Sequence, residues 1–386
     1  MIQRNISVII VYAIMNPVIS NLAEENNTLS FTLSGVNVSL ANALRRIMLS
    51  DIPCVVFRTT PYAESKMDIV VNTTRLNNEL IKQRMSCIPI HISDTSFPID
   101  NYEVQINKKN ESDVIDYVTT EDIRIKDLQS DKYLSDAAVK AIFPPNKITG
   151  DYIDIARLRP KISEDIDGEE LSLTSRLDIG TAKQDGAFNI VCTAAYGYTK
   201  DPVKINDFLT EMDKALKAEG LDQDAIDFKK KDWLLLGADT LTVADSFDFT
   251  VESVGQFTNM DICRRAANVM LEKLDRFDQA IKTNPELIAA SETTLDNGYD
   301  IKMIGEDYTL GKAIEYVLYE THYKRGVMNF CGFRKPHPHI DESLIRLGFK
   351  ESTSKDDVVA MLSASILSLK SVFNQIEDFF KPSSTE

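Results

Sequence analysis

A short histidine-containing segment is the part of this sequence whose residue types and spacing come nearest to a metal site. His337 and His339 are separated by one proline, and Asp341 follows. On an extended strand both rings of a His-x-His pair lie on one face, but a zinc site needs a third protein ligand. The only other histidines are His91 and His322, and nothing supports Asp341 as that ligand. A metal-dependent enzyme using His337 and His339 is therefore the alternative interpretation.

Other signatures of chemistry are missing from the sequence. It contains no G-x-S-x-G, P-loop or G-x-G-x-x-G motif, so neither a nucleophile nor a nucleotide cofactor is indicated. The net charge of -16 argues against a large nucleic-acid surface, because phosphate binding requires Lys and Arg. We expect no cofactor, no metal, no small-molecule substrate and no strong direct DNA binding. Reduced thiols without CxxC spacing are indicated by the five scattered cysteines Cys54, Cys87, Cys192, Cys263 and Cys331.

A strand followed by an amphipathic helix occurs twice along the chain. Residues 28–36 alternate apolar and polar side chains, and Asn37 is expected to cap a helix that Pro53 ends. Residues 299–305 and Asp307 repeat the pattern. Aligning SGVNVSLANALRRIML with IGEDYTLGKAIEYVLY brings glycine, cap and apolar positions together, which indicates an internal duplication. The two apolar faces consist of Leu40, Leu44, Ile47 and Met48, and of Leu310, Ile314, Val317 and Leu318.

A long helix is predicted downstream of each copy. Residues 261–283 carry one apolar stripe, and residues 355–380 carry apolar side chains in alternating steps of three and four. That spacing is typical of a helix that packs along another helix. We expect the two long helices to share an interface, although each could instead cover its own sheet. The residues expected at this interface are Met270, Leu274, Leu362, Ile366, Leu369 and Phe373.

The remaining segments define the predicted domain organisation. Short alternating runs separated by turn signals at 54–190 predict a mostly β domain, inserted into a first module that spans 1–53 and 191–284. Within that module, 201–231 reads as an exposed helical insertion with mixed charge, and 1–20 as an N-terminal extension. Its apolar run 7–15 is interpreted as an added strand or tail rather than a signal peptide. A linker at 285–297 precedes a second module at 298–386.

Several sequence blocks, in order, resemble one family. ANALRRIMLSDIPCVVF at 41–57 is similar to the signature shared by bacterial alpha, the archaeal D subunit and the third subunit of eukaryotic RNA polymerase II. The blocks at 71–92 and 247–274 resemble later parts of that family. EDYTLGKAIEYVLY at 306–319 and NFCGFRKPHPHIDESLIRLGF at 329–349 look like the eleventh subunit and the archaeal L subunit. The chain thus resembles a fused alpha-like subunit, of the kind encoded by large cytoplasmic DNA viruses.

The resemblance implies an α+β fold in which two alpha-type dimerisation modules, each an antiparallel sheet plus helices, pair within one chain. It implies a non-catalytic assembly platform for the two largest RNA polymerase subunits and a small subunit of the tenth/twelfth-subunit type. Arg45 and Arg46 are then expected to contact a large subunit. The family's metal domain is not carried over, because no cysteine lies between Cys87 and Cys192.

The location follows from the same resemblance. We expect an intracellular protein without membrane association, in the host cytoplasm (viral factory) and virion, with the nucleus as the alternative. A dimeric scaffold unrelated to transcription would explain the repeated modules, but it would not explain the ordered family blocks.

Overall fold

The computed structural model describes residues 15–94, 96–163 and 166–382, and the chain divides into two compact units. The first contains residues up to Met48, Thr193–Glu252 and those from Asn259 onward, and the second contains Leu49–Cys192 and Ser253–Thr258. Antiparallel sheets and helices make up both units, which confirms the α+β class. The N-terminal run at 7–15 falls outside the described residues, except for Met15.

The first sheet has four antiparallel strands, in the order β1-β2-β13-β12. Phe31 and Phe249 pair across its centre and stack with ring centroids 5.0 Å apart. Sequence patterning did not predict β1, because its side chains are nearly all exposed and do not alternate. The elements are β1 (Val18–Glu25), β2 (Thr28–Ser34), α2 (Val38–Ser50), β12 (Val191–Lys200), β13 (Thr242–Ser253) and α7 (Asn259–Thr283).

The second sheet also has four antiparallel strands, in the order β14-β15-β17-β16. Part of the predicted linker at 285–297 belongs to this sheet, because Ala289 pairs with Asp300. Edge strands as short as β14 carry too little pattern to be recognised before their partner strand is known. The elements are β14 (Ile288–Ala290), β15 (Gly298–Ile304), α8 (Tyr308–Leu318), β16 (Met328–Arg334), β17 (Glu342–Phe349) and α9 (Lys355–Phe379).

The two sheets have the same topology. Each begins with an edge strand and a second strand that leads into a short helix, and each ends with a strand that leads into a long helix. Gly35 and Gly305, which join strand to short helix, have φ values of +73° and +72°. Their amide groups donate to the main-chain oxygens of Asp245 and Asp341, at 2.8 and 2.7 Å. The chain therefore contains two copies of one sheet-and-helix module.

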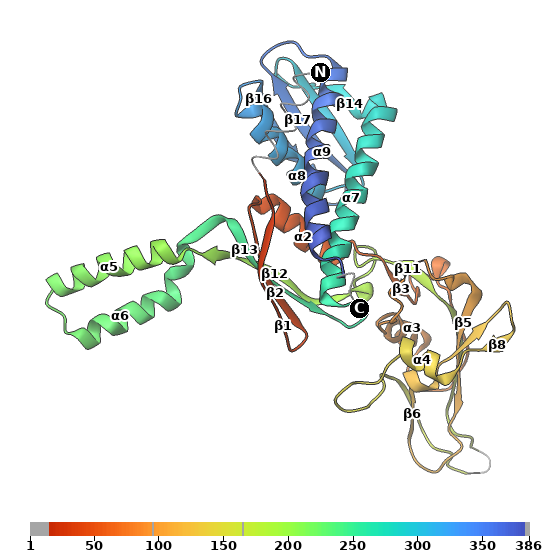
Figure 1. The fold of residues 1–386 in the computed structure, drawn as a ribbon. Helices are drawn as coiled ribbons and strands as arrows, with labels where there is room; N and C mark the ends of the chain where they lie inside the picture. The colour runs from red at the N-terminus through yellow and green to blue at the C-terminus, as the bar shows by residue number, and fades with distance from the viewer. Residues whose placement is uncertain (1–14, 95, 164–165, 383–386) are drawn as a thin grey trace. The chain divides into compact units, whose positions relative to one another are not determined.

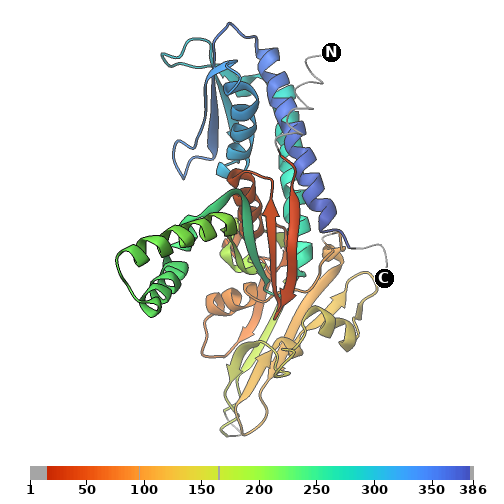
Figure 2. The same cartoon turned by 60° about the vertical axis from the view of Figure 1, so that its left-hand side comes forward.

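The long helices α7 and α9 pack side by side (Figures 1 and 2). Both contain 25 residues. A capping box starts α9, since the Ser354 hydroxyl accepts from the Asp357 amide and the Asp357 carboxylate accepts from the Ser354 amide. By length and composition α9 could cross a membrane, but its apolar stripe is buried against α7 and α8. Core helices of folded proteins meet the same criterion, so the property is explained by packing.

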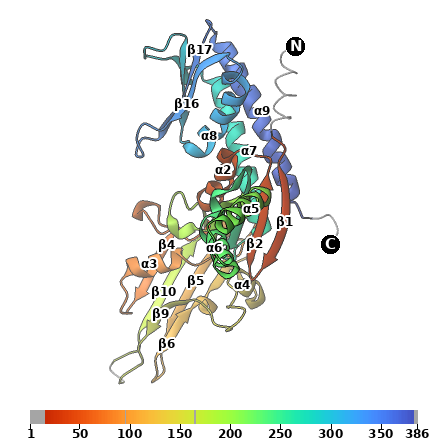
Figure 3. The same ribbon diagram turned by 90° about the vertical axis from the view of Figure 1, so that its left-hand side faces the viewer.

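A helical hairpin separates β12 from β13 (Figure 1) and is seen end-on in Figure 3. It consists of α5 (Pro202–Ala218) and α6 (Gln223–Leu236), whose N-termini are capped by Asp201 and Asp222. Phe208 and Trp233 stack between the helices with centroids 4.1 Å apart. The insertion expected at 201–231 is helical, and it continues to Leu236.

The second unit is mostly β, with one hydrophobic core that includes Phe57, Ile81, Val104 and Leu173. Its main sheet has the order β4-β10-β5-β7-β8. The elements are β3 (Cys54–Val56), β4 (Met67–Asn72), α3 (Asn78–Ser86), β5 (Tyr102–Lys109), β6 (Asp116–Thr119), β7 (Arg124–Asp127), β8 (Lys132–Tyr133), α4 (Asp136–Ile142), β9 (Asp154–Leu158), β10 (Glu170–Arg176) and β11 (Asp178–Gly180).

Candidate interface between the two modules

The main contact between the modules runs along α7 and α9. Lys370 Nζ lies 2.5 Å from Asp275 Oδ1, and Ser363 Oγ donates to Asp278 Oδ1 at 2.6 Å. Residue numbers increase along α7 in the direction in which they decrease along α9, so the two helices are antiparallel. This arrangement places each long helix partly over the other module, and Phe380 after α9 packs edge-on against Phe31 of the first sheet.

All the apolar residues predicted at the interface are buried. Burial alone does not assign each one to the contact between modules, because α8 also packs on β16 and β17 of its own sheet. The extended contact between the modules is made by α7 with α9, whereas α8 packs on α9 within the second module. The buried set comprises Leu40, Leu44, Ile47, Met48, Met270, Leu274, Leu310, Ile314, Val317, Leu318, Leu362, Ile366, Leu369 and Phe373.

Four charged residues join the modules at the start of α8. Arg46 Nη2 of α2 lies 2.8 Å from Asp307 Oδ2, and Lys273 Nζ of α7 lies 3.1 Å from Glu306 Oε2. We call Arg46, Lys273, Glu306 and Asp307 the acid–base cluster. The side chains of Lys273 and Glu306 are only 8% and 15% exposed, whereas those of Arg46 and Asp307 are 36% and 27% exposed. One ion pair is thus largely buried and the other is partly hydrated.

Helix α8 positions the acidic half of the cluster. Asp307 is its N-cap, and Asp307 Oδ1 accepts from the Thr309 amide at 2.8 Å, which leaves Oδ2 to accept from Arg46. Arg46 Nε also donates to the Thr309 hydroxyl at 2.8 Å. Carboxylates at this end of α8 are additionally stabilised by the positive end of the helix dipole. The cap that starts the helix therefore also binds the other module.

Arg45 has different neighbours from Arg46. Its guanidinium donates to Asn42 Oδ1 on its own helix, at 3.0 and 3.1 Å. It also lies near Tyr196 of β12. Burial, and to a lesser extent Tyr198, raise the pKa of Tyr196, and the charge of Arg45 offsets part of that rise. The expected contact of both arginines with a large subunit stays a prediction, but Arg46 already has partners within this chain.

The histidine segment forms a turn. The His337 main-chain oxygen accepts from the Ile340 amide at 3.1 Å, and His337 Nδ1 accepts from the His339 amide at 3.1 Å. Asp341 contributes its main-chain oxygen to Gly305, as Asp245 does in the first module. Within 15–94, 96–163 and 166–382, no group of three or more His, Cys, Asp or Glu residues is placed to hold a metal ion. The hydrogen bonds of His337 stabilise a β-turn.

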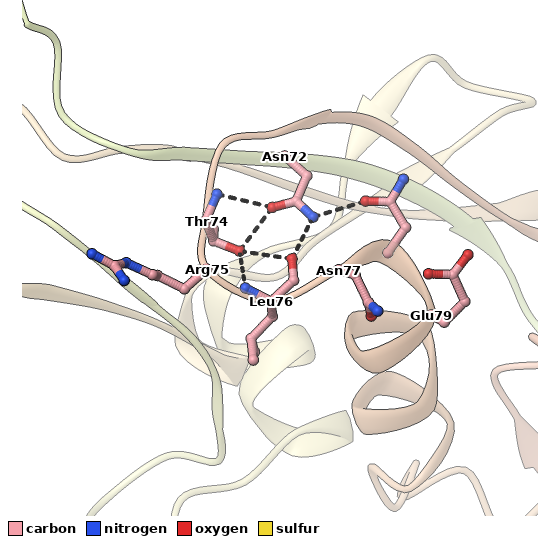
Figure 4. Close-up of a pocket in the computed structure, with 7 residues that line it drawn as sticks. Asn72, Thr74, Arg75, Leu76, Asn77 and Glu79 are labelled. Carbon is pink, nitrogen blue, oxygen red and sulfur yellow. Dashed lines mark hydrogen bonds between the residues drawn. The ribbon is translucent and has the colours of Figure 1, made fainter.

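A polar hollow lies in the second unit, between β4 and the start of α3 (Figure 4). Asn72 Oδ1 accepts from the amide and hydroxyl of Thr74, and Asn72 Nδ2 donates to Leu76 O at 2.9 Å. Asn77 caps α3 by accepting from the Leu80 amide at 2.9 Å. These polar groups stabilise the loop and helix start themselves, so the hollow has a structural explanation.

Sequence reasoning missed Lys273 and Glu306. Lys273 lies on the buried stripe of α7, three residues after Met270 and four before Phe277. A lysine at such a position needs a buried acidic partner, because an unpaired buried charge is costly. That position was a usable signal, but the partner could be identified only once the modules were placed together.

The fold and this interface define a protein built from two pairing α+β modules. Residues 30–274 match the family described as the RNA polymerase Rpb3/Rpb11 dimerisation domain, and the chain belongs to this family. Rpb3-type members of this family are non-catalytic, and the relatives of this chain are named as subunits of DNA-directed RNA polymerase.

Curated relatives agree with the family assignment. The chain is 23% identical to DNA-directed RNA polymerases I and III subunit rpac1 of Dictyostelium discoideum, over 68% of this chain and 81% of the relative. It is 26% identical to DNA-directed RNA polymerases IV and V subunit 3B of Arabidopsis thaliana, over 68% and 89%. It is 24% identical to DNA-directed RNA polymerase subunit Rpo3 of Pyrococcus horikoshii, over 66% and 94%.

Proposed function

We propose that this chain is an intramolecular heterodimer of two alpha-like modules and acts as the assembly platform of a DNA-dependent RNA polymerase. The observation that carries the proposal is the repeated topology: two sheets of identical strand order, each with a short and a long helix, joined by antiparallel α7 and α9. A dimerisation family whose second partner lies in the same chain accounts for this arrangement.

The extent of the family match supports the fusion. It ends at residue 274, within α7, whereas the second module begins at β14. The curated relatives align with about two thirds of this chain and most of their own length. The second module therefore adds, in the same polypeptide, what the family supplies as a second dimerisation partner.

Fusion changes the energetics of pairing. Two modules joined by a short flexible segment experience an effective concentration on the order of millimolar, so pairing does not depend on the protein concentration. A platform that is already paired can bind large subunits without first paying the entropy of bringing two small chains together. Nucleation of the two largest subunits, with a small subunit of the tenth/twelfth-subunit type, follows from this role.

The test is affinity purification of the tagged chain from its native source, with mass spectrometry of the bound proteins. Two very large polymerase subunits in near-equal amount are the expected result. Recovery of the chain alone would contradict the assembly role, and a bound metal in that sample would favour the alternative enzyme built on His337 and His339.

We also propose that the chain is encoded by a large cytoplasmic DNA virus, since fusion of the two partners is the feature that distinguishes it from separate subunits. The expected location is the host cytoplasm, at viral factories, and the virion. Immunofluorescence of producing cells and immunoblots of purified particles test this. A signal confined to the nucleus of uninfected cells would contradict it.

A further inference from the structure

We propose that the acid–base cluster determines which modules pair: it favours pairing of unlike modules and disfavours pairing of like ones. This inference rests on the proposed intramolecular heterodimer and adds the residues that specify it. The cluster is asymmetric, because α2 and α7 of the first module supply both cations and the residues before α8 supply both anions.

The repeated topology identifies the position that corresponds to each cluster member. The strand and short helix of the first module are numbered 270 lower than those of the second module, as for Gly35 and Gly305. Val36 and Asn37 therefore correspond to Glu306 and Asp307. By the same offset Tyr316 corresponds to Arg46. Between the long helices the offset is 96, since α7 starts at Asn259 and α9 at Lys355, and Leu369 therefore corresponds to Lys273.

The modules are related by an approximate twofold arrangement. Arg46 contacts Asp307 in the second module. Its counterpart Tyr316 lies close enough to Asp245 of the first module for the Asp245 charge to act on it. Burial, Glu320 and Asp245 together raise the pKa of Tyr316. Asp245 is bonded to Gly35, immediately before the positions that correspond to the acids. Each short helix thus approaches the strand–helix junction of the other module.

Pairing of like modules would remove the acid–base contacts of the cluster. Two first modules would place Lys273 opposite Val36, and two second modules would place Glu306 opposite Leu369. Both Val36 and Leu369 are buried, with 1% and 0% exposure. Removing the partner of a buried ion weakens the structure strongly, whereas replacing a whole buried pair by apolar residues can be neutral. The cluster therefore contributes specificity rather than simple attraction.

The proposal is tested by moving the acidic dipeptide to the first module in the full-length chain. The variant carries Val36→Glu, Asn37→Asp, Glu306→Val and Asp307→Asn. Asn and Asp are both effective N-caps, so the starts of α2 and α8 are retained. In this variant a second copy of the first module offers Lys273 and Arg46 the acids that the second module offers them in the wild type. Light scattering after size exclusion is expected to show the wild type as a monomer and the variant at twice the monomer mass or more.

A restored variant adds the exchange of the cations: Lys273→Leu with Leu369→Lys, and Arg46→Tyr with Tyr316→Arg. In this variant the unlike modules again place each acid opposite a base, so a monomer is expected. The control exchanges the exposed pair between the long helices, Lys370→Asp with Asp275→Lys, whose side chains are 30% and 53% exposed. That chain is expected to stay monomeric, because exposed ion pairs contribute little.

Two results would overturn the proposal. One is an acid-transfer variant that stays monomeric with an unchanged urea midpoint. The other is a restored variant that is not a monomer. If the acid-transfer variant fails to fold while the restored variant is a folded monomer, the proposal is supported, because only the match of acid and base differs. These measurements use the purified chain alone, so they are independent of whether it binds polymerase subunits.

Discussion

At the residue scale, two adjacent arginines on α2 illustrate how one helix serves two different surfaces. Arg46 is bound to Asp307 and Thr309 of the second module, whereas Arg45 contacts Asn42 on its own helix and lies near Tyr196. Neighbouring positions on a helix are about 100° apart, so consecutive side chains point in different directions. Substitutions of Arg45 and of Arg46 are therefore expected to affect different functions.

Reversing each arginine separately tests this division. Arg46→Glu places a carboxylate beside Asp307 and is expected to lower the free energy of unfolding by about 1 kcal/mol, a modest value because the pair is partly hydrated. Arg45→Glu is expected to leave the urea midpoint unchanged and to reduce recovery of the two large subunits in the affinity purification. Equal recovery with Arg45→Glu would exclude a large-subunit contact at that residue.

The two glycines at the strand–helix junctions form a second matched pair of tests. Both have positive φ, so an alanine at either position costs about 1–2 kcal/mol of backbone strain. At Gly35 a Cβ would also lie 2.1 Å from the main-chain oxygen of Asn16, whereas at Gly305 the nearest atom is Asp341 Oδ2 at 4.0 Å. Gly35→Ala is therefore expected to be clearly more destabilising than Gly305→Ala in urea unfolding. Equal losses would mean that the Asn16 segment moves aside at little cost.

At the element scale, α7 and α9 carry the contact between modules, and α2 and α8 fix how the modules approach. The short helices are buried along one face and are held by caps at Asn37 and Asp307. Each long helix is antiparallel to the other and extends over the other module. A substitution that disrupts a long or a short helix is therefore expected to destabilise both modules.

Aspartate substitutions test this coupling. Leu44→Asp on α2 or Ile314→Asp on α8 buries an unpaired carboxylate at a fully buried position, which costs several kcal/mol. Limited proteolysis is expected to reveal new cleavage sites in α7 and α9 as the modules separate. Leu367→Asp on α9 is the control, because that side chain is 55% exposed and should leave the pattern unchanged. Buried variants that are cleaved like the wild type would argue against the paired-module arrangement.

At the scale of the whole molecule, one polypeptide contains two modules and the segment that joins them. After α7 the chain enters β14, which pairs with β15, and residues 292–294 that follow β14 are exposed. A cut at these residues would leave β14 attached to the first module but paired in the sheet of the second. Non-covalent contacts alone are thus available to hold the two fragments together.

Cleavage at a protease site inserted at 292–294 measures how much the tether contributes. The fragments are expected to co-elute on size exclusion at high concentration and to dissociate on dilution, because cleavage removes the millimolar effective concentration. Intact chain carrying the same inserted site is the control and is expected to elute at one position at every concentration. Fragments that separate even when concentrated would show that the tether, rather than the interface, holds the modules together.

Much of this protein follows from its sequence because the signals are local. Residues 28–36 and 299–305 alternate at period two, Asn37 and Asp307 cap helices, and the apolar stripes of α7 and α9 repeat at helical spacing. Each of these patterns depends on residues close together in the chain, where backbone hydrogen bonding and burial of one face are decided. The repeated strand–helix units and the long helices followed from them, whereas the α+β class and the family were implied by the resemblance of the ordered sequence blocks.

The tertiary structure decided what depends on distant partners. The β1 and β14 edge strands exist through pairing with β2 and β15, although their own side chains carry little pattern. Lys273 and Glu306 form an ion pair in a largely buried setting, which no local pattern shows. The sequence by itself determined the two modules; how they recognise each other was decided in space, because electrostatic pairing joins residues that the chain order keeps apart.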